Sequence, residues 1–243
     1  MKIQFDKIFR NLLVVDIETA SAYGDYHDMD ERMQYLWDKK ASYMQKTEET
    51  SSQELYFDKG AIYAEFGKVI CISAGIFTKE EDNSIGFRIK SFALDTEKET
   101  LSAFNSLVES KFESKYLRMV AHNGKEFDFP YLCRRMLVNE IDIPEALDIR
   151  DKKPWDINHI DTMELWKFGD RKNFTSLDLL ATMFGIESSK DDIDGSEVNK
   201  VYYKENDLKR ISEYCQRDVM VTAQVFLKLN GFQKIDEKNI KFL

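Results

Sequence analysis

The chain has 243 residues, a formal net charge of −9 and a hydrophobic content of 43%. This length suits one large domain, or one domain with an inserted subdomain. The acidic balance excludes a protein that coats nucleic acid through bulk positive charge. It does not exclude an enzyme that grips a few phosphates in one cleft through metal ions.

Several features of the sequence predict a cytoplasmic protein. Residues 1–10 lack the apolar region of a signal peptide, and no apolar stretch approaches the roughly 18 residues of a membrane span. The cysteines Cys71, Cys133 and Cys215 are too few and too scattered for a disulfide framework or a zinc site. Each lies in an apolar segment, so we interpret them as buried free thiols.

The first predicted element is a buried strand at residues 12–19 that carries two acids near its end. Asp16 and Glu18 are two positions apart, so their side chains project from the same side of the strand. Neighbouring anions repel each other, and an unpaired buried charge is unfavourable. A divalent cation such as Mg²⁺ or Mn²⁺ would relieve both effects. The alternative is a strand that simply ends in solvated acids.

Residues 20–60 predict an irregular insertion that contains two helices, at about residues 30–44 and 53–64. The polar stretch 47–52 between them is typical of a loop. The aromatic and aliphatic side chains of the first helix predict an apolar face that packs against the domain. The alternative is that this segment forms a cap over a cleft.

The rest of the chain alternates between predicted strands and helices. Strands are expected at residues 69–77, 85–92, 116–121 and 157–161, and helices at 96–112, 129–139, 162–168, 175–184 and 207–229. No repeat, low-complexity tract or interdomain linker is present in the sequence. The pattern predicts one mixed α/β domain over residues 1–243, with acids at the ends of its strands.

A third candidate acid, Asp128, follows the strand at residues 116–121. Asp128 lies just before a helix with Pro130 in its first turn, so its simplest interpretation is a helix N-cap. However, the turn at residues 122–124 comes directly from a strand and would bring backbone donors near the strand end. Phe127 and Phe129 flank the acid, and we expect core packing from them before stacking on a base.

The last predicted helix carries a tyrosine and an acid on its inward face. Tyr214 and Asp218 are four residues apart and therefore lie on the same side. Buried polar groups need partners. One interpretation is a buried hydrogen bond between Tyr214 and Asp218, or an ion pair between Asp218 and an arginine. The other is that Asp218 completes a metal site in which Tyr214 orients a water molecule.

Three motifs in this order resemble the DEDD exonuclease superfamily. They are Asp16-Ile17-Glu18, the His-Asn-Gly-x-x-Phe-Asp segment that ends at Asp128, and Tyr214-x-x-x-Asp218. The chain is most similar to the tyrosine-type subclass, as in the proofreading domains of family-B DNA polymerases. The resemblance extends over residues 11–229 and implies a ribonuclease H-like mixed sheet flanked by helices. Residues 20–60 match no motif of the family and form a helical insertion after the first strand.

This resemblance implies a 3′–5′ exonuclease that releases nucleoside 5′-monophosphates from the 3′ end of single-stranded DNA. In such a protein Asp16, Glu18 and Asp218 would hold one divalent cation, and Asp16 with Asp128 would hold a second. Two Mg²⁺ or Mn²⁺ ions of this kind activate the attacking water and stabilise the leaving 3′ oxygen. Tyr214 would position that water. The implied partners are a single-stranded 3′ end and a polymerase or repair protein.

Four further residues are candidates to bind the terminal nucleotide by the same resemblance: Thr19 through its backbone, His122, Asn123, and Phe129 by packing near the base. Asp161 and Thr162 give a weaker signal. They either contribute to the rim of the cleft or belong to a short core helix.

Three alternatives remain open at this point. The same chemistry would serve an exoribonuclease on short RNA, since no residue reveals whether a 2′-hydroxyl is read. A catalytically silent scaffold for nucleic acid or protein would not need all four acids and the tyrosine. Hydrolysis of free nucleotides would use the same cations.

Overall fold

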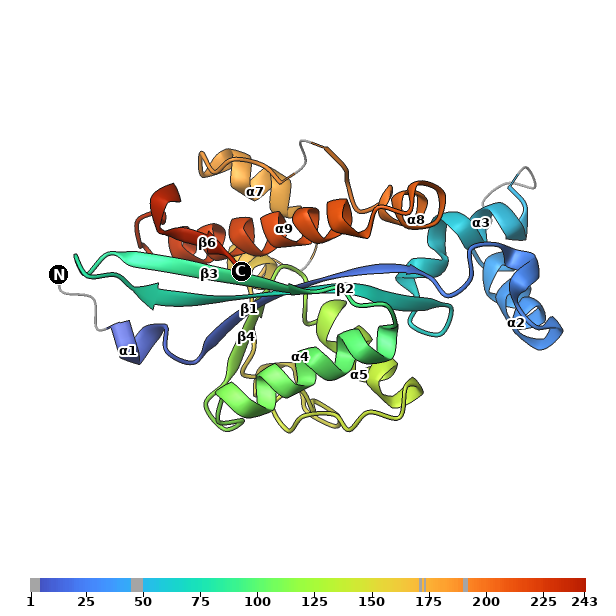
Figure 1. The fold of residues 1–243 in the computed structure, drawn as a ribbon, viewed down its shortest axis with the longest axis horizontal. Helices are drawn as coiled ribbons and strands as arrows, with labels where there is room; N and C mark the ends of the chain where they lie inside the picture. The colour runs from blue at the N-terminus through green and yellow to red at the C-terminus, as the bar shows by residue number, and fades with distance from the viewer. Residues whose placement is uncertain (1–4, 45–49, 171, 173, 190–191) are drawn as a thin grey trace.

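The structure, a computed structural model, describes residues 5–44, 50–170, 172, 174–189 and 192–243. Its centre is a six-stranded sheet with the strand order β5-β4-β1-β2-β3-β6 (Figure 1). The strands are β1 Leu12–Ser21, β2 Gly67–Lys79, β3 Ile85–Phe92, β4 Arg118–Ala121, β5 Ile160–Asp161 and β6 Ile240–Phe242. The pairs β1–β2 and β2–β3 are antiparallel, whereas β4, β5 and β6 each run parallel to a neighbour. The predicted mixed sheet is therefore confirmed.

Helices cover both faces of this sheet. The long helix α9, Leu208–Leu229, lies on one face, and α4, Glu97–Lys111, and α5, Asp128–Val138, lie on the other (Figure 1). Successive side chains of β1 point to opposite faces of the sheet, so this strand contributes to the hydrophobic cores on both faces. Leu13 and Val15 belong to the core beneath α4 and α5, while Leu12 and Val14 pack into the core of α9. Asp16 and Glu18 have the same parity as Leu12 and Val14, so they project toward α9.

The insertion after β1 folds around its own small core. It contains η1, Tyr26–Asp28, α2, Glu31–Ser42, α3, Ser52–Lys59, and the short turn η2, Gly60–Ile62. Trp37, Ala41, Tyr56 and Phe66 are buried together there. Helix α3 begins at a capping box formed by Ser51 and Glu54 and ends earlier than predicted, where the 3-10 turn starts. Residues 47–49 of the loop predicted at 47–52 lie outside the described residues.

Shorter elements complete the fold. They are α1 Phe5–Ile8, η3 Pro154–Asp156, α6 Thr162–Lys167, α7 Leu177–Met183, α8 Val198–Lys200, the π-helical turn η4 Val201–Glu205 and η5 Glu237–Asn239. Helix α7 starts two residues later than predicted because Ser176 caps it, with its side chain accepting from Leu179 N. The π-helical turn and β6 were not predicted. In the described part of the chain, no helix has the length and apolar character that a membrane crossing requires.

Candidate active site

Asp16 and Glu18 lie at the centre of the site, on the side of β1 that faces α9. One carboxylate oxygen from each and the sulfur of Cys215 lie within 4.8 Å of one another. The pairing of β1 with β2 shifts register between Glu18 and Thr19. Such bulges re-aim side chains and are frequent beside active sites. The same-side placement predicted for the two acids is the one observed.

Asp128 reaches β1 from the start of α5. Its Oδ1 accepts a hydrogen bond from the backbone N–H of Ile17 at 3.2 Å, and its side chain is only 4% exposed. The N-cap interpretation is wrong, because Phe127 occupies the capping position and no side-chain cap is present there. The carboxylate instead joins two segments 111 residues apart, between the two acids of the first motif.

Tyr214 and Asp218 project inward from α9 as the helical spacing predicted, and both are buried. Asp218 accepts a hydrogen bond from the hydroxyl of Ser189. Ser189 is itself buried and belongs to the segment that leads to α8. No feature of the sequence pattern connects Ser189 to Asp218, and the contact was not predicted.

The charges of these acids act on one another, which shows that Asp16, Glu18, Asp128 and Asp218 share one region; we call them the acid cluster. Burial raises the pKa of Asp16 well above its usual range, and the charges of Asp218 and Asp128 raise it further. Burial also raises the pKa of Glu18, and repulsion from the charges of Asp16 and Asp218 raises it further. Asp128 has its pKa raised to about 7, mainly by burial.

Three members of the acid cluster lack a cationic partner in the part of the chain that the structure describes. Among the residues that the structure describes, Asp16, Glu18 and Asp128 form no salt bridge with a lysine or arginine. Buried carboxylates without a cation favour protonation or the binding of a metal ion. Their oxygens are the hard ligands that Mg²⁺ and Mn²⁺ take, so the donor set fits such cations.

Cys215 donates from its thiol to Asp16, at 3.3 Å from Oδ2 and 3.4 Å from the backbone oxygen. Burial raises the pKa of this thiol, so it remains a donor that orients the carboxylate. No sequence pattern indicated this role for Cys215. All three cysteines are free as expected; Cys71 and Cys215 are buried, while Cys133 is half-buried.

Tyr214 is held as a neutral donor. Burial raises the pKa of its hydroxyl, and the charges of Asp218, Glu18 and Asp16 raise it further. The phenol therefore keeps its proton next to the acid cluster. This protonated hydroxyl is suited to orienting a water molecule.

The turn before Asp128 is organised by Asp161. The side chain of Asp161 accepts from the backbone N–H of Asn123 at 3.0 Å and of Lys125 at 3.2 Å, and it also caps α6. Its carboxylate is only 2% exposed. Of the two interpretations left open for Asp161 and Thr162, the observed contacts are those of a structural support for the turn.

The residues predicted to contact the terminal nucleotide differ in their surroundings. The ring nitrogens of His122 are both engaged, with Thr162 Oγ1 and with the backbone oxygen of Thr175, each at 2.9 Å. Phe129 is 0% exposed and packs against the ring of His159, so it belongs to the core as expected, and its contact with a base stays a prediction. Asn123 has a φ of 62° and a buried side-chain oxygen without a hydrogen-bond partner. Thr19 lies half-buried at the bulge.

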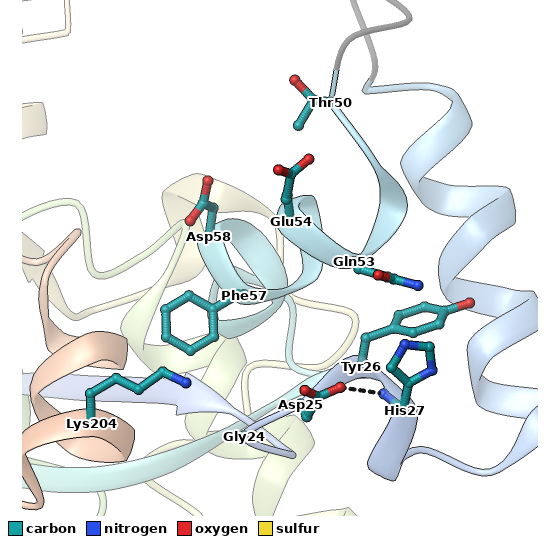
Figure 2. A pocket seen from close by; sticks show the side chains of 10 residues that line it. All are labelled: Gly24, Asp25, Tyr26, His27, Thr50, Gln53, Glu54, Phe57, Asp58 and Lys204. Atoms are coloured by element: carbon teal, nitrogen blue, oxygen red, sulfur yellow. Dashed lines mark hydrogen bonds between the residues drawn. The ribbon is translucent and has the colours of Figure 1, made fainter.

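A separate cavity of about 750 Å³ borders the insertion. Figure 2 shows its lining, which comes from the loop after β1, from α3 and from Lys204 of η4. Asp25 and His27 are joined there by a hydrogen bond from the His27 backbone, and Phe57 lies opposite Lys204. No member of the acid cluster lines this cavity. The alternative that the insertion forms a cap over a cleft stays a prediction.

Comparison with solved structures shows the fold. The chain is similar to a family B DNA polymerase from the hyperthermophilic archaeon Pyrobaculum calidifontis, with a TM-score of 0.57 and 15% sequence identity. The similarity covers 90% of this chain but only 24% of the polymerase, so the chain spans about a quarter of that protein. The sheet and its helices therefore have the ribonuclease H-like arrangement that was expected. No curated protein matches the chain.

Comparison with protein families identifies residues 62–241. The matching model describes a predicted 3′–5′ exonuclease related to the exonuclease domain of PolB. The matched stretch contains Asp128, Tyr214 and Asp218, while Asp16 and Glu18 precede it. The chain belongs to this family of predicted 3′–5′ exonucleases related to the exonuclease domain of PolB.

Proposed function

We propose that this protein is a two-metal-dependent 3′–5′ exonuclease that removes nucleotides from the 3′ end of single-stranded DNA. The observation that carries the proposal is the acid cluster, in which four carboxylates from β1, α5 and α9 lie so close together that the charges of Asp218 and Asp128 raise the pKa of both Asp16 and Glu18. A fold needs no such cluster for stability, whereas phosphodiester hydrolysis by two cations needs it. DNA is the proposed substrate because the related exonuclease domain belongs to a DNA polymerase.

On this proposal the carboxylates divide between two cations. Asp16, Glu18 and Asp218 hold one, and Asp128 with Asp16 holds the other. Asp128 Oδ1 is oriented by the amide of Ile17, which leaves Oδ2 to face a cation. When bound, the cations lower the pKa of the attacking water and stabilise charge on the leaving oxygen.

The remaining steps belong to the chain's own side chains. The neutral hydroxyl of Tyr214 holds the water in line with phosphorus, and the thiol of Cys215 fixes the orientation of Asp16. Water attacks the phosphorus, the bond to the 3′ oxygen breaks, and that oxygen takes up a proton. The products are a nucleoside 5′-monophosphate and a strand shorter by one nucleotide.

Digestion of a 5′-labelled single-stranded DNA tests this function. With Mg²⁺ or Mn²⁺ we expect a ladder that shortens from the 3′ end, with nucleoside 5′-monophosphates as the released product. The control is Asp16→Ala, which should be inactive under the same conditions. Cleavage by Asp16→Ala, or a reaction unaffected by EDTA, would rule out the assignment. An RNA of the same sequence reports whether a 2′-hydroxyl is tolerated.

Tyr214→Phe separates water positioning from metal binding. Loss of the hydroxyl should lower kcat on the order of 100-fold, because the variant lacks only the group that orients the water. Mn²⁺ affinity, measured by calorimetry, should stay unchanged. Weakened Mn²⁺ binding would show that the tyrosine serves the cations instead.

A further inference from the structure

A cavity of about 420 Å³ lies on the opposite face of the sheet from the acid cluster. Its floor includes Leu13, Ala74, Leu107 and Phe112, which belong to or pack against the core beneath α4. A volume of this size is within the usual range for binding sites in proteins. We call this cavity the basic pocket, for the charges at its edge.

The apolar floor is open because the sheet extends past α4. Figure 1 shows the hairpin end of β2 and β3 continuing beyond that helix, which ends at Lys111. Ile76, in this part of β2, is consequently 39% exposed. Ile76 pairs with Arg88 and Ala74 pairs with Lys90 in the antiparallel register. Paired residues project from the same face, so two cations flank the apolar floor.

Four cationic side chains line the basic pocket, against one anion, the terminal carboxylate of Leu243. Arg10, Arg88, Lys90 and Lys111 line it, and its lining contains no aspartate or glutamate. None of the four cations forms a salt bridge within the described part of the chain. The Nε of Arg88 is buried and has no hydrogen-bond partner. Four unpaired cations around an apolar floor are notable in a chain with a net charge of −9.

We propose that the basic pocket docks a short acidic segment of a partner protein, which inserts one bulky apolar side chain beside Ile76. The carboxylates of this segment would pair with Arg88 and Lys90, and an acceptor would reach the buried Nε of Arg88. Charge complementarity selects an acidic partner, and the apolar floor selects an anchor side chain.

The DNA substrate is a poorer occupant for two reasons. Asp16 and Glu18 project toward α9, whereas the basic pocket opens on the α4 face, so a strand in the active site would have to pass around the sheet. The floor is also apolar and presents Leu13, Ala74 and Ile76, which offer a phosphate chain no hydrogen bonds. The docking proposal therefore does not depend on the exonuclease proposal.

Selection from a displayed library of random 12-residue peptides tests the proposal. The wild-type protein is the bait, and Arg88→Glu/Lys90→Glu is the subtracting bait. Lys39→Glu/Lys98→Glu is the matched control, since both lysines are exposed and lie outside the pocket while the charge change is the same. We expect wild type and control to enrich peptides in which Asp or Glu flanks Leu, Ile or Phe. Recovery of the same peptides by all three proteins, or of none, overturns the proposal.

The strongest selected peptide, labelled with fluorescein, gives the quantitative test by anisotropy. Arg88→Glu/Lys90→Glu should weaken its binding at least about tenfold, and Ile76→Ser should weaken it several-fold. Binding should weaken between 0.1 M and 1 M salt, because screening shortens the Debye length from about 10 Å to about 3 Å. Exonuclease rates of these variants should equal that of wild type, which separates this test from that of the active site.

Two results would assign the basic pocket to another occupant and so overturn the proposal. Displacement of the peptide by a single-stranded oligonucleotide would make it a nucleic-acid site. A concentration-dependent dimer in analytical ultracentrifugation that Arg88→Glu/Lys90→Glu abolishes would make it a contact between two copies of this chain.

Discussion

Two regions of this molecule shield carboxylates from solvent, but only one of them supplies a cationic partner. On the α4 face, Glu97 receives Arg135 through two hydrogen bonds of 2.8 and 2.7 Å, together with the Val69 amide and Asn139. On the α9 face, Asp16 and Glu18 receive no cation from the described part of the chain. The same fold therefore neutralises a buried acid where the acid serves structure.

This contrast identifies the acids that are available for chemistry. Glu97 has its acceptor positions filled by the protein, so no ligand is needed and none has room. The acid cluster keeps its repulsion, which disfavours the metal-free folded state and favours whatever cation relieves it. Four experiments test this contrast.

The largest effect should come from the acid cluster. Asp218→Asn removes one charge while keeping the shape of the side chain, and we expect exonuclease activity to fall by about 1000-fold or more, equivalent to roughly 4 kcal/mol. Thermal unfolding without metal should show an unchanged or higher Tm, since a like charge has been removed. Asp58→Asn, an exposed acid outside the cluster, is the matched control. A large fall in Tm would mean that Asp218 is structural.

Arg135→Leu should have the reverse signature. It leaves Glu97, whose side chain is only 11% exposed, without its cation, which should lower the free energy of unfolding by about 3–5 kcal/mol. Activity per folded molecule should persist. Urea titration measures the loss, and Glu97→Gln/Arg135→Leu should recover much of it because no uncompensated charge remains. If the double variant is as unstable as the single one, the pairing argument is incorrect.

The stability of the metal-free protein should fall as pH rises. Asp128 has a pKa raised from 3.8 to about 7 in the folded protein, so between these values the folded state binds more protons than the unfolded state. Its stabilising contribution is complete below about pH 4 and is lost as pH rises through about 7, a change on the order of 2–4 kcal/mol. Unfolding in EDTA from pH 4 to 8 measures it. Asp128→Asn should flatten this dependence, and an unchanged slope would contradict it.

Divalent cations should restore the stability lost at high pH. At a concentration of 100 times Kd, Mn²⁺ should raise the free energy of unfolding of the wild type by about 2.7 kcal/mol at pH 8. Asp16→Ala should respond much less, whereas Arg135→Leu should respond like the wild type. Equal responses from all three proteins would place the bound cation elsewhere.

Sequence patterns predicted the parts of the fold and site that depend on local periodicity. Strand alternation placed Asp16 and Glu18 on one side, and the four-residue spacing placed Tyr214 with Asp218. The β1 to β4 strands and the long helices appear where expected because apolar spacing determines them. The family resemblance supplied Asp128, which local pattern alone would have left as an N-cap.

The contacts that sequence could not predict are long-range or conformational. The bonds from Ser189 to Asp218 and from Cys215 to Asp16 depend on how loops and helices pack, which no spacing encodes. Phe129 lies in the core as its apolar character predicted, but its packing against His159 depends on the tertiary fold. The basic pocket depends on a register between β2 and β3 and on where α4 ends.

The alternation along β1 also limits how this protein can evolve. A strand with one hydrophobic core on each side tolerates substitutions at a single position, but it does not tolerate a change in length. One residue gained or lost just before Asp16 would rotate both acids into the layer beneath α4 or, if the acids kept their place, would expel Leu13 and Val15 from that layer. Descendants of this chain should therefore vary freely in the segment after β1 while retaining the count of residues that leads up to the acids.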